Sequence, residues 1–434
     1  MPSSTMVEHL PASGASNWPE FRIGELGQVE AGRQRNPNAP GTPRPYLRVA
    51  NVYDGRLDLS DVLEMPFTDN EFERFRLHPG DILLNEGQSL QLVGRCSLYR
   101  GEPVSVAFQN SLIRFRAGPN VETEFAFQLF RHLQYSGVFS SVATQTTSIA
   151  HLGVSRFASI PVRIPPLPEQ RKIAAILSSV DETIVKTEAV IAQLEVVKKA
   201  LIERLLARGM PGRHVSFKQT EAGALPSSWH IVRLSEVAEV RTGLSKNSKR
   251  ALATTVELPY LRVANVQDGH LDLDEVKTIA VEASQVERFL LHRGDVLFCE
   301  GGDADKVGRG TVWRGELPLC LHQNHVFAVR PTDAVLPEFL SIYRGSSRGK
   351  AYFLDAAKQT TNLASINSTQ LRALPLPLPP IEEQQEIVAI VVATADRISI
   401  QRRSLKSLQS IKTALLDALL SGRIRMNPVA QEAA

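Results

Sequence analysis

The chain contains one long segment twice, and this duplication limits the possible folds more than any other feature of the sequence. The eighteen residues that begin at Pro45 and at Pro259 are identical at fourteen positions, with an offset of 214. A period of this length lies far beyond the roughly 20 to 50 residues of stacked solenoid repeats. The same offset also aligns residues 72–87 with 286–301, 93–95 with 307–309, 109–110 with 323–324, and 144–152 with 358–366. The sequence therefore predicts two copies of one domain.

Each copy has the pattern of a mixed α/β domain. The segment PYLRVANV is strand-like in both copies and precedes an Asp-Gly turn signal. Gly-Asp followed by three apolar residues, at 80–84 and 294–298, predicts a turn that leads into a buried strand. Residues 121–135 and 336–345 each favour a helix. We expect an α+β fold, with two tandem mixed α/β domains separated by two long helices that form an antiparallel coiled coil.

The long helices are predicted from the segments that follow a proline-rich stretch at the end of each copy. Proline is tolerated in a first helical turn, and early carboxylates suit the helix dipole. Apolar residues then recur every three or four residues, which is the spacing of a coiled-coil seam. The predicted seam residues are Ile173, Leu177, Val180, Ile184, Ile191, Leu194, Leu201 and Leu205, then Ile387, Val391, Ile398, Leu405, Leu408, Leu415 and Leu419.

Two arrangements of these helices fit the seam. Each helix could pack on its own domain, or the two could pack on each other. The polar interruptions match between the helices, at Lys198 and Lys412 and at Thr187 and Gln401, which favours mutual pairing. The order domain, helix, domain, helix then allows antiparallel pairing with one domain at each end. About 38 residues at about 1.5 Å each would make a spacer of roughly 55 to 60 Å.

The predicted boundaries follow from these patterns. We expect a first domain at 1–166, a first spacer helix at 167–210, a second domain at 211–380, a second spacer helix at 381–423 and a flexible tail at 424–434.

With these features in this order, the chain resembles the specificity (S) subunit of type I restriction–modification systems, from about Trp18 to Gly422. The shared marks are LPSSWHIVRLSEV at 225–237, the GDILL and GDVLF strands, the Gln-Asn pairs, the QTT segments and the PPLPEQ and PPIEEQ helix starts. The two halves are more alike than is usual in that family, where the two domains of one chain recognise different DNA sequences. Their likeness suggests a recent duplication or similar half-sites.

The resemblance implies a function and a set of partners. Each domain would be a target-recognition domain that reads one half of a split site in double-stranded DNA. The helices would set the gap and dock two methyltransferase (modification) subunits, to which two restriction subunits can be added. The resemblance implies that S-adenosylmethionine, ATP and Mg²⁺ bind to those partners, and we expect no cofactor on this chain.

Motifs for catalysis are missing or incomplete. No Asn-Pro-Pro-Tyr segment for a flipped base is present. Residues 345–351 are one residue short of a P-loop and lack its magnesium-binding hydroxyl. The repeated pairs Asp81 with Glu86 and Asp295 with Glu300 lack the lysine of a metal nuclease, so we interpret them as turn-stabilising carboxylates. We therefore expect no catalytic residue and no metal site.

Composition agrees with this interpretation but does not decide it. The net charge of +3 suits an ordinary protein and equally a DNA-binding protein that shares phosphate binding with partner subunits. Three cysteines without a CxxC pair suit a reducing compartment. Since the sequence also contains no signal-peptide pattern and no long apolar run, we expect a cytoplasmic protein that does not contact membranes.

Candidate DNA-binding side chains gather at loop positions in both copies. Arg, Asn and Gln can bond two edge atoms of a base, whereas Lys and Arg bind phosphates. The candidates are Arg33, Gln34, Arg35, Gln88, Gln91, Gln109, Asn110, Gln145, Thr146, Thr147 and Ser148, then Lys246, Asn247, Lys249, Arg250, Asp303, Lys306, Gln323, Asn324, His325, Lys358, Gln359, Thr360, Thr361 and Asn362. For each residue alone, a solvated loop is the alternative.

Comparison of the copies divides these candidates. Positions that the copies share, such as Gln145 with Gln359, suggest scaffold or phosphate contacts. Positions that differ, such as Gln88 with Gly302, Ser111 with His325 and Ser148 with Asn362, are the ones expected to set specificity. Two other functions remain open: a self-sufficient methyltransferase or nuclease, disfavoured by the missing motifs, and a coiled-coil scaffold with two domains that do not bind DNA.

Overall fold

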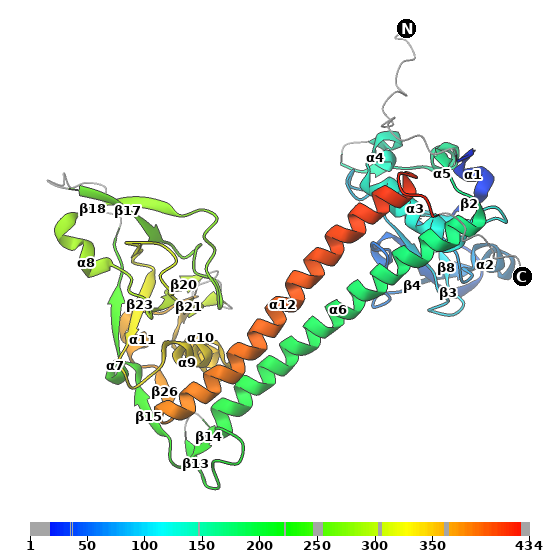
Figure 1. Ribbon diagram of the computed structural model, residues 1–434. Coiled ribbons are helices and arrows are strands. Elements are labelled where there is room, and N and C mark those ends of the chain that lie inside the picture. The colour runs from blue at the N-terminus through cyan, green and yellow to red at the C-terminus, as the bar shows by residue number, and fades with distance from the viewer. Residues whose placement is uncertain are drawn as a thin grey trace, which may run out of the picture. The chain divides into compact units, whose positions relative to one another are not determined.

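The computed structural model describes residues 18–34, 36, 38–145, 148–220, 223–245, 255–302, 306–359 and 364–426. The chain divides into two compact units, Met1–Glu188 with Arg403–Ala434, and Ala189–Arg402. Each unit contains one copy of the duplicated domain together with half of each long helix (Figure 1). The α+β fold class predicted from the sequence is confirmed.

In the first unit, short strands form small sheets that surround a four-stranded sheet of order β2-β9-β5-β7. A three-stranded sheet of order β4-β3-β8 contains a parallel pair, β3 with β8. The strands are β1 (Glu20–Arg22), β2 (Gly27–Ala31), β3 (Thr42–Leu47), β4 (Leu63–Phe67), β5 (Ile82–Asn85), β6 (Gly87–Gln88), β7 (Cys96–Leu98), β8 (Ala107–Phe108), β9 (Leu112–Ala117), β10 (Thr144–Gln145), β11 (Ala150–His151) and β12 (Pro161–Arg163). The helices are α1 (Ile23–Leu26), η1 (Val49–Asn51), α2 (Asp69–Phe75), α3 (Thr123–Tyr135), α4 (Val138–Val142) and α5 (Val154–Ser159), followed by α6 (Leu167–Arg208).

The second unit repeats this topology, with a four-stranded sheet of order β16-β23-β19-β21. Its strands are β13 (Phe217–Thr220), β14 (Gly223–Pro226), β15 (His230–Arg233), β16 (Ala238–Thr242), β17 (Thr255–Leu261), β18 (Lys277–Glu282), β19 (Val296–Cys299), β20 (Gly301–Gly302), β21 (Gly310–Val312), β22 (Leu321–His322), β23 (Val326–Pro331), β24 (Lys358–Gln359), β25 (Ala364–Ser365) and β26 (Pro375–Leu378). The helices are α7 (Leu234–Val237), η2 (Ala283–Gln285), α8 (Val286–Phe289), α9 (Pro337–Gly345), α10 (Ser347–Ala356), α11 (Ser368–Arg372) and α12 (Ile381–Leu420).

Several local expectations are confirmed. The helices predicted at 121–135 and 336–345 are α3 and α9, and the predicted buried strands are β5 and β19, in which every residue is buried. The strand predicted from PYLRVANV is shorter than expected, because it ends at Leu47 and the chain turns into η1. The buried Asn51 holds this turn: its side chain accepts a hydrogen bond from Arg48 N and donates to the carbonyls of Asp58 and Asp61. Asn265 makes the same contacts in the second copy.

The long helices pair antiparallel within each unit. In the first unit, Leu416 and Leu419 near the end of α12 share one core with Ile173 and Leu177 near the start of α6. In the second unit, Leu205 near the end of α6 shares a core with Ile387 and Val391 near the start of α12. Every predicted seam residue is buried or half-buried. The alternative arrangement also holds in part, since these helix ends belong to the cores of the domains.

The Glu-Gln pair at the start of each long helix ties three segments together. The buried Glu383 accepts hydrogen bonds from Met210 N at 2.9 Å and Trp229 Nε1 at 3.0 Å, and its Oε1 lies 2.8 Å from His214 Nε2. Burial raises the pKa of Glu383, but the hydrogen bonds from Met210 N, His214 and Trp229 outweigh this, and the pKa lies below its usual value. Met210 follows the end of α6, so the carboxylate joins the start of one helix to the end of the other.

The adjacent glutamine binds the globular domain instead. Gln384 Oε1 accepts a hydrogen bond from Leu336 N at 2.9 Å, and Gln384 Nε2 donates to the carbonyl of Ala334 at 3.0 Å. Gln170 makes the equivalent contacts in the first unit, with Glu122 N and the carbonyl of Asn120.

Glu169 binds the start of the segment 424–434, for which the sequence predicts a flexible tail. Arg425 donates two hydrogen bonds to the Glu169 carboxylate, at 2.9 and 3.0 Å, and Met426 N donates a third at 2.9 Å. The chain beyond the end of α12 is therefore part of the fold as far as Met426, and residues 427–434 lie outside the described range.

We expect Glu383→Ala to lower the free energy of unfolding by about 3–5 kcal/mol, because it leaves buried donors unpaired and removes a buried charged partner. Chemical denaturation followed by circular dichroism measures this loss. Glu386→Ala is the matched control: Glu386 forms an exposed pair with Arg213 at 2.8 Å, and its loss should change stability little. Equal stability losses in the two variants would show that Glu383 does not join these segments.

Candidate nucleic-acid interface

The end of β5 is the point where the predicted DNA-binding loops of the first unit meet. Glu86 follows this strand, and its backbone N donates to the carbonyl of Ser111 at 2.9 Å. Its carbonyl accepts from Leu152 N at 2.8 Å, and its carboxylate Oε2 lies 3.0 Å from His151 Nδ1. One residue therefore connects the Gln109-Asn110 turn, the β6 segment and the strand after the QTT loop.

A small sheet of order β10-β11-β6 places two predicted readers on either side of its central strand. Gln88 in β6 and Gln145 in β10 both pair with Ala150 of the central strand β11. Gln145 is exposed and Gln88 is half-buried, and Ser148 lies exposed in the loop between β10 and β11. The structure thus brings together three side chains that lie up to 60 positions apart in the sequence.

The segment that contains Arg33 crosses the segment that contains Gln109 and Asn110. Arg33 pairs with Gln109 in a parallel bridge, and Asn110 N donates to the Arg33 carbonyl at 3.0 Å. Gly32 permits this crossing, because a Cβ atom there would lie 2.4 Å from the Gln109 backbone. Asn110 is exposed, and Gln109 is half-buried and accepts a hydrogen bond from the Ser111 hydroxyl at 3.2 Å.

The second unit repeats the convergence at the end of β19. Glu300 N donates to the His325 carbonyl at 2.9 Å, and the Glu300 carbonyl accepts from Ile366 N at 2.8 Å. The sheet of order β20-β25-β24 corresponds to β6-β11-β10, and Asn324 N donates to the Leu244 carbonyl, as Asn110 N does to that of Arg33. Gly243 is close to the Gln323 backbone, as Gly32 is to that of Gln109.

One candidate departs from the expectation of a solvated loop side chain. Arg33 is buried, its guanidinium Nε lies 3.0 Å from Glu71 Oε1, and the guanidinium stacks over the ring of Phe67 at 5.0 Å. In this structure Arg33 supports the crossing of two segments and its guanidinium is not presented to solvent. The sequence could not show this, since Glu71 and Phe67 belong to a distant hairpin and helix.

The structure describes some of the remaining candidate DNA-binding residues and leaves others outside the described range. Gln34, Gln91, His325 and Lys358 are exposed, and Lys306, Gln323 and Asn324 are half-buried. Gln359 is described only as part of β24. The candidates outside the described residues are Arg35, Thr146, Thr147, Lys246, Asn247, Lys249, Arg250, Asp303, Thr360, Thr361 and Asn362. DNA binding by any of these residues stays a prediction.

Sequence reasoning missed the Glu–His pairs at this place. Glu86 pairs with His151 of β11, whereas the equivalent Glu300 pairs with His325, which lies in the turn before β23. The two copies therefore keep the glutamate and take the histidine from different segments, β11 in the first copy and the turn before β23 in the second. Repetition of the glutamate was visible in the sequence, but His151 corresponds to Ser365 and so carried no repeated signal.

The other repeated carboxylates have the structural role that we expected. Asp81 is buried, accepts a hydrogen bond from His78 N at 2.8 Å and binds Arg116 through both oxygens, at 2.6 and 2.8 Å. Asp295 makes the same contacts with His292 N and Arg330. These residues close the turn before β5 and before β19, and they bind the start of each of these strands to the neighbouring strand, β9 or β23.

Two observations on the described residues concern metal binding and thiol chemistry. No group of three or more His, Cys, Asp or Glu side chains suited to a metal ion occurs among them. The three cysteines are buried, and burial raises the pKa of the Cys320 thiol to about 12, which disfavours a reactive thiolate.

Within the part of the chain that the structure covers, no helix has the length and apolar character needed to cross a membrane.

Comparison with known proteins agrees with this geometry. A relative from Methanocaldococcus jannaschii, named a putative type I restriction enzyme MjaX specificity subunit, is 24% identical over 386 residues, which cover 88% of this chain and 87% of the relative. The type I restriction enzyme EcoKI specificity subunit of Escherichia coli is 25% identical over 391 residues, which cover 88% of this chain and 82% of that subunit.

Solved structures show the same fold. A chain from a study of complex assembly and conformational transition of the type I R-M system has a TM-score of 0.59 at 19% identity, covering 95% of this chain and 100% of that one. The S subunit of a type I restriction–modification system from M. genitalium has a TM-score of 0.52 at 15% identity, covering 95% and 98%.

The family model of the type I restriction modification DNA specificity domain matches residues 15–196 and again 226–410, which together make up most of the chain. The chain belongs to the family of type I restriction–modification DNA specificity subunits.

Proposed function

We propose that this chain is the non-catalytic specificity subunit of a type I restriction–modification complex and reads a bipartite site in double-stranded DNA. The observation that carries the proposal is the repeated convergence at Glu86 and at Glu300. In each unit, segments far apart in sequence present amide and charged side chains at one end of the central sheet. Such side chains can bond base edges and phosphates. Each domain would therefore read one half-site.

The long helices offer a surface for partner subunits. Apolar residues outside the seam are exposed on their outer faces, at Val185, Val190, Val196, Val197, Val392, Ile400 and Ile411. Exposed apolar side chains of this kind are available for contact with a partner protein. We propose that two methyltransferase subunits dock here and that restriction subunits can join them. S-adenosylmethionine, ATP and Mg²⁺ would bind to those subunits, in the cytoplasm where the DNA lies.

Changing Gln88 should alter one half-site only. Gln88→Gly gives the first domain the residue of the second domain at the equivalent position, Gly302, so the strand should tolerate it. We expect discrimination at one base of the first half-site to fall roughly tenfold to a hundredfold, since a good bidentate contact contributes about 1–3 kcal/mol. Sequencing of methylated bases in cells that carry the variant with its methyltransferase partner measures this.

Gln28→Ala is the matched control for that variant. Gln28 is an exposed glutamine of β2 and pairs with Arg116, at the opposite end of the sheet from Glu86. It should leave the methylated sequence unchanged. A change in both half-sites after Gln88→Gly would contradict the assignment of one half-site to each domain.

The chain alone should not modify DNA. Purified chain incubated with duplex DNA and tritiated S-adenosylmethionine should incorporate no methyl groups above background, and with ATP and Mg²⁺ it should not cut. Adding the methyltransferase subunit should restore methylation, while binding to DNA should weaken as salt rises. Methylation by the chain alone would show that it is an enzyme, and absence of DNA binding with the partner present would favour a scaffold role.

The helices should set the length of the unread gap. One heptad added after Ile191 and one after Leu405 keeps the seam in register and lengthens the pair by about 10 Å, or roughly three base pairs. We expect the gap in the methylated motif to grow by about one to three base pairs, with both half-sites unchanged. Four residues added to one helix only should be tolerated less well, because the seams then slip. An unchanged gap in a stable, active heptad variant would show that other elements set the spacing.

A further inference from the structure

The first unit contains a partly buried network of charges between its globular domain and the long helices. Arg131 of α3 binds Asp54 with Nε at 2.8 Å and Asp181 of α6 with Nη1 at 2.9 Å. Asp181 also accepts hydrogen bonds from Lys412 of α12 and, at 2.8 Å, from Gln128. Burial raises the pKa of Asp181, but the charge of Arg131 and the bond from Lys412 outweigh this, so the pKa lies below its usual value. Two carboxylates balance two cations.

The second unit has the same network without its central carboxylate. Asp268 corresponds to Asp54, and Arg344 Nη2 binds it at 2.9 Å, while Lys198 stands at the position of Lys412. At the offset of 214, however, Asp181 corresponds to Ala395. The neighbouring Asp396 is exposed and does not line the space left by the missing carboxylate.

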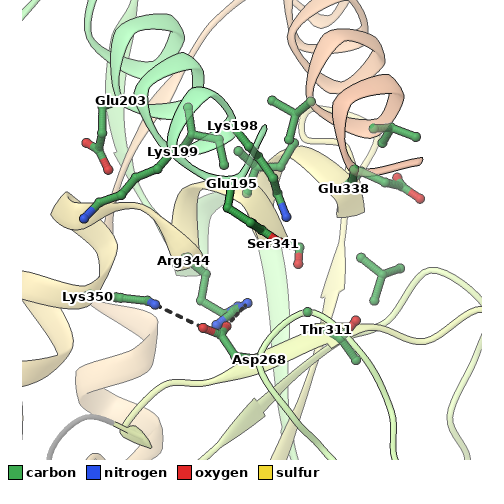
Figure 2. Close-up of a pocket in the computed structure, with 18 of the residues that line it drawn as sticks. Glu195, Lys198, Lys199, Glu203, Asp268, Thr311, Glu338, Ser341, Arg344 and Lys350 are labelled. Atoms are coloured by element: carbon green, nitrogen blue, oxygen red, sulfur yellow. Dashed lines mark hydrogen bonds and ion pairs between the residues drawn. The ribbon is translucent and has the colours of Figure 1, made fainter. Parts of the chain in front are cut away.

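A cavity of about 520 Å³ lies where that carboxylate is missing. Lys198, Ala395 and Arg344 all line it, and Val391 and Ile202 supply apolar wall. Figure 2 shows Lys198 directed from α6 into the space above Arg344 and Asp268, with Lys350 at one side. The volume falls within the roughly 300–1,000 Å³ of small-molecule sites, and it is far larger than one carboxylate requires.

Two cations that line the cavity have donor atoms without a partner. Lys198 makes no hydrogen bond or ion pair with any described residue, and Arg344, which is 3% exposed, has a buried Nε without a partner among the described residues. Asp268 is shared by Arg344 and by Lys350 at 3.0 Å. Among these four residues there is one carboxylate for three cations, whereas the network of the first unit has two carboxylates for two cations.

None of the three glutamates that line the cavity binds Lys198, Arg344 or Lys350, because each has another partner. Glu195 pairs with Arg402 at 2.9 Å, Glu338 with Arg314 at 3.5 Å, and Glu203 accepts a hydrogen bond from Ser347 N at 2.7 Å. They would, however, repel a highly charged anion such as phosphate more than a carboxylate. The position of the Asp181 carboxylate in the first unit points to the same chemical group.

We propose that the cavity between α6, α9 and α12 of the second unit binds a small carboxylic acid, whose carboxylate takes the place that Asp181 occupies in the first unit. Lys198 and Arg344 would bind the carboxylate, and the apolar wall formed by Val391 and Ile202 would contact the rest of the ligand. The buried Arg344 is already held by Asp268 and by the carbonyl of Gly308 at 3.2 Å, so the site is preorganised.

Butyrate, which has one carboxylate and a short apolar chain, is a suitable probe, and calorimetric titration of the purified full-length chain at constant ionic strength in chloride measures its binding. We expect one equivalent to bind the wild-type chain, and neutral methyl butyrate not to bind. Ala395→Asp supplies the missing carboxylate from the chain itself and should weaken butyrate binding at least tenfold. Lys198→Ala removes a cation from the site and should weaken binding similarly, so the test does not depend on one variant.

Lys186→Ala is the control, because Lys186 lies on the same helix in the first unit and its side chain is 76% exposed. It should bind butyrate as the wild type does. Circular dichroism checks that each variant is folded. The proposal is wrong if wild-type chain gives no butyrate binding, or if folded Ala395→Asp and Lys198→Ala bind butyrate unchanged. Equal affinity for sulfate and butyrate would overturn the carboxylate assignment in favour of a general anion site.

Discussion

A buried glutamate at the start of each long helix is the contact on which the rest of each unit depends. Burying a carboxylate is costly unless its oxygens are bonded, and Glu383 and Glu169 meet this condition with donors from the end of the opposite helix. The adjacent glutamine bonds the backbone of the globular domain. Because only the antiparallel arrangement brings those donors to the carboxylate, the two residues together select the helix pairing and the seating of the domain on it.

The duplicated carboxylate keeps its backbone donor and changes a charged partner. Met210 N binds Glu383 and Met426 N binds Glu169, each from the segment after the opposite helix. Glu383 also binds His214, whereas Glu169 binds the guanidinium of Arg425. A carboxylate accepts bonds from many directions, so either set satisfies it. The same tolerance appears at Glu86 and Glu300, whose histidine partners come from β11 and from the turn before β23. The acceptors that hold the scaffold are retained between the copies, and some of the side chains around them have changed.

The most similar stretches of the two copies turn out to be scaffold. Asn51 and Asn265 hold the turn after the first strand of the small sheet, and Gly94 and Gly308 leave room for the rings of Phe139 and Phe353. A Cβ atom at either glycine would lie within 2.4 Å of a ring atom. Near-identity over such positions follows from packing, and it leaves the exposed loops free to differ. The exchange of Asp181 for Ala395 shows that a half-buried charged position can also change.

The sequence by itself determined the duplication, the two long helices with their seam, the buried central strands and the helices α3 and α9. These features depend on periodicity and turn chemistry among residues a few positions apart, which a single sequence displays. Only the tertiary structure decided that Arg33 supports a crossing of segments, that Glu86 joins three loops, and that the Glu-Gln pair ties one helix to the end of the other and to the domain. A polar side chain looks the same in sequence whether it faces solvent or a partner, and its role depends on which distant segment the fold brings beside it.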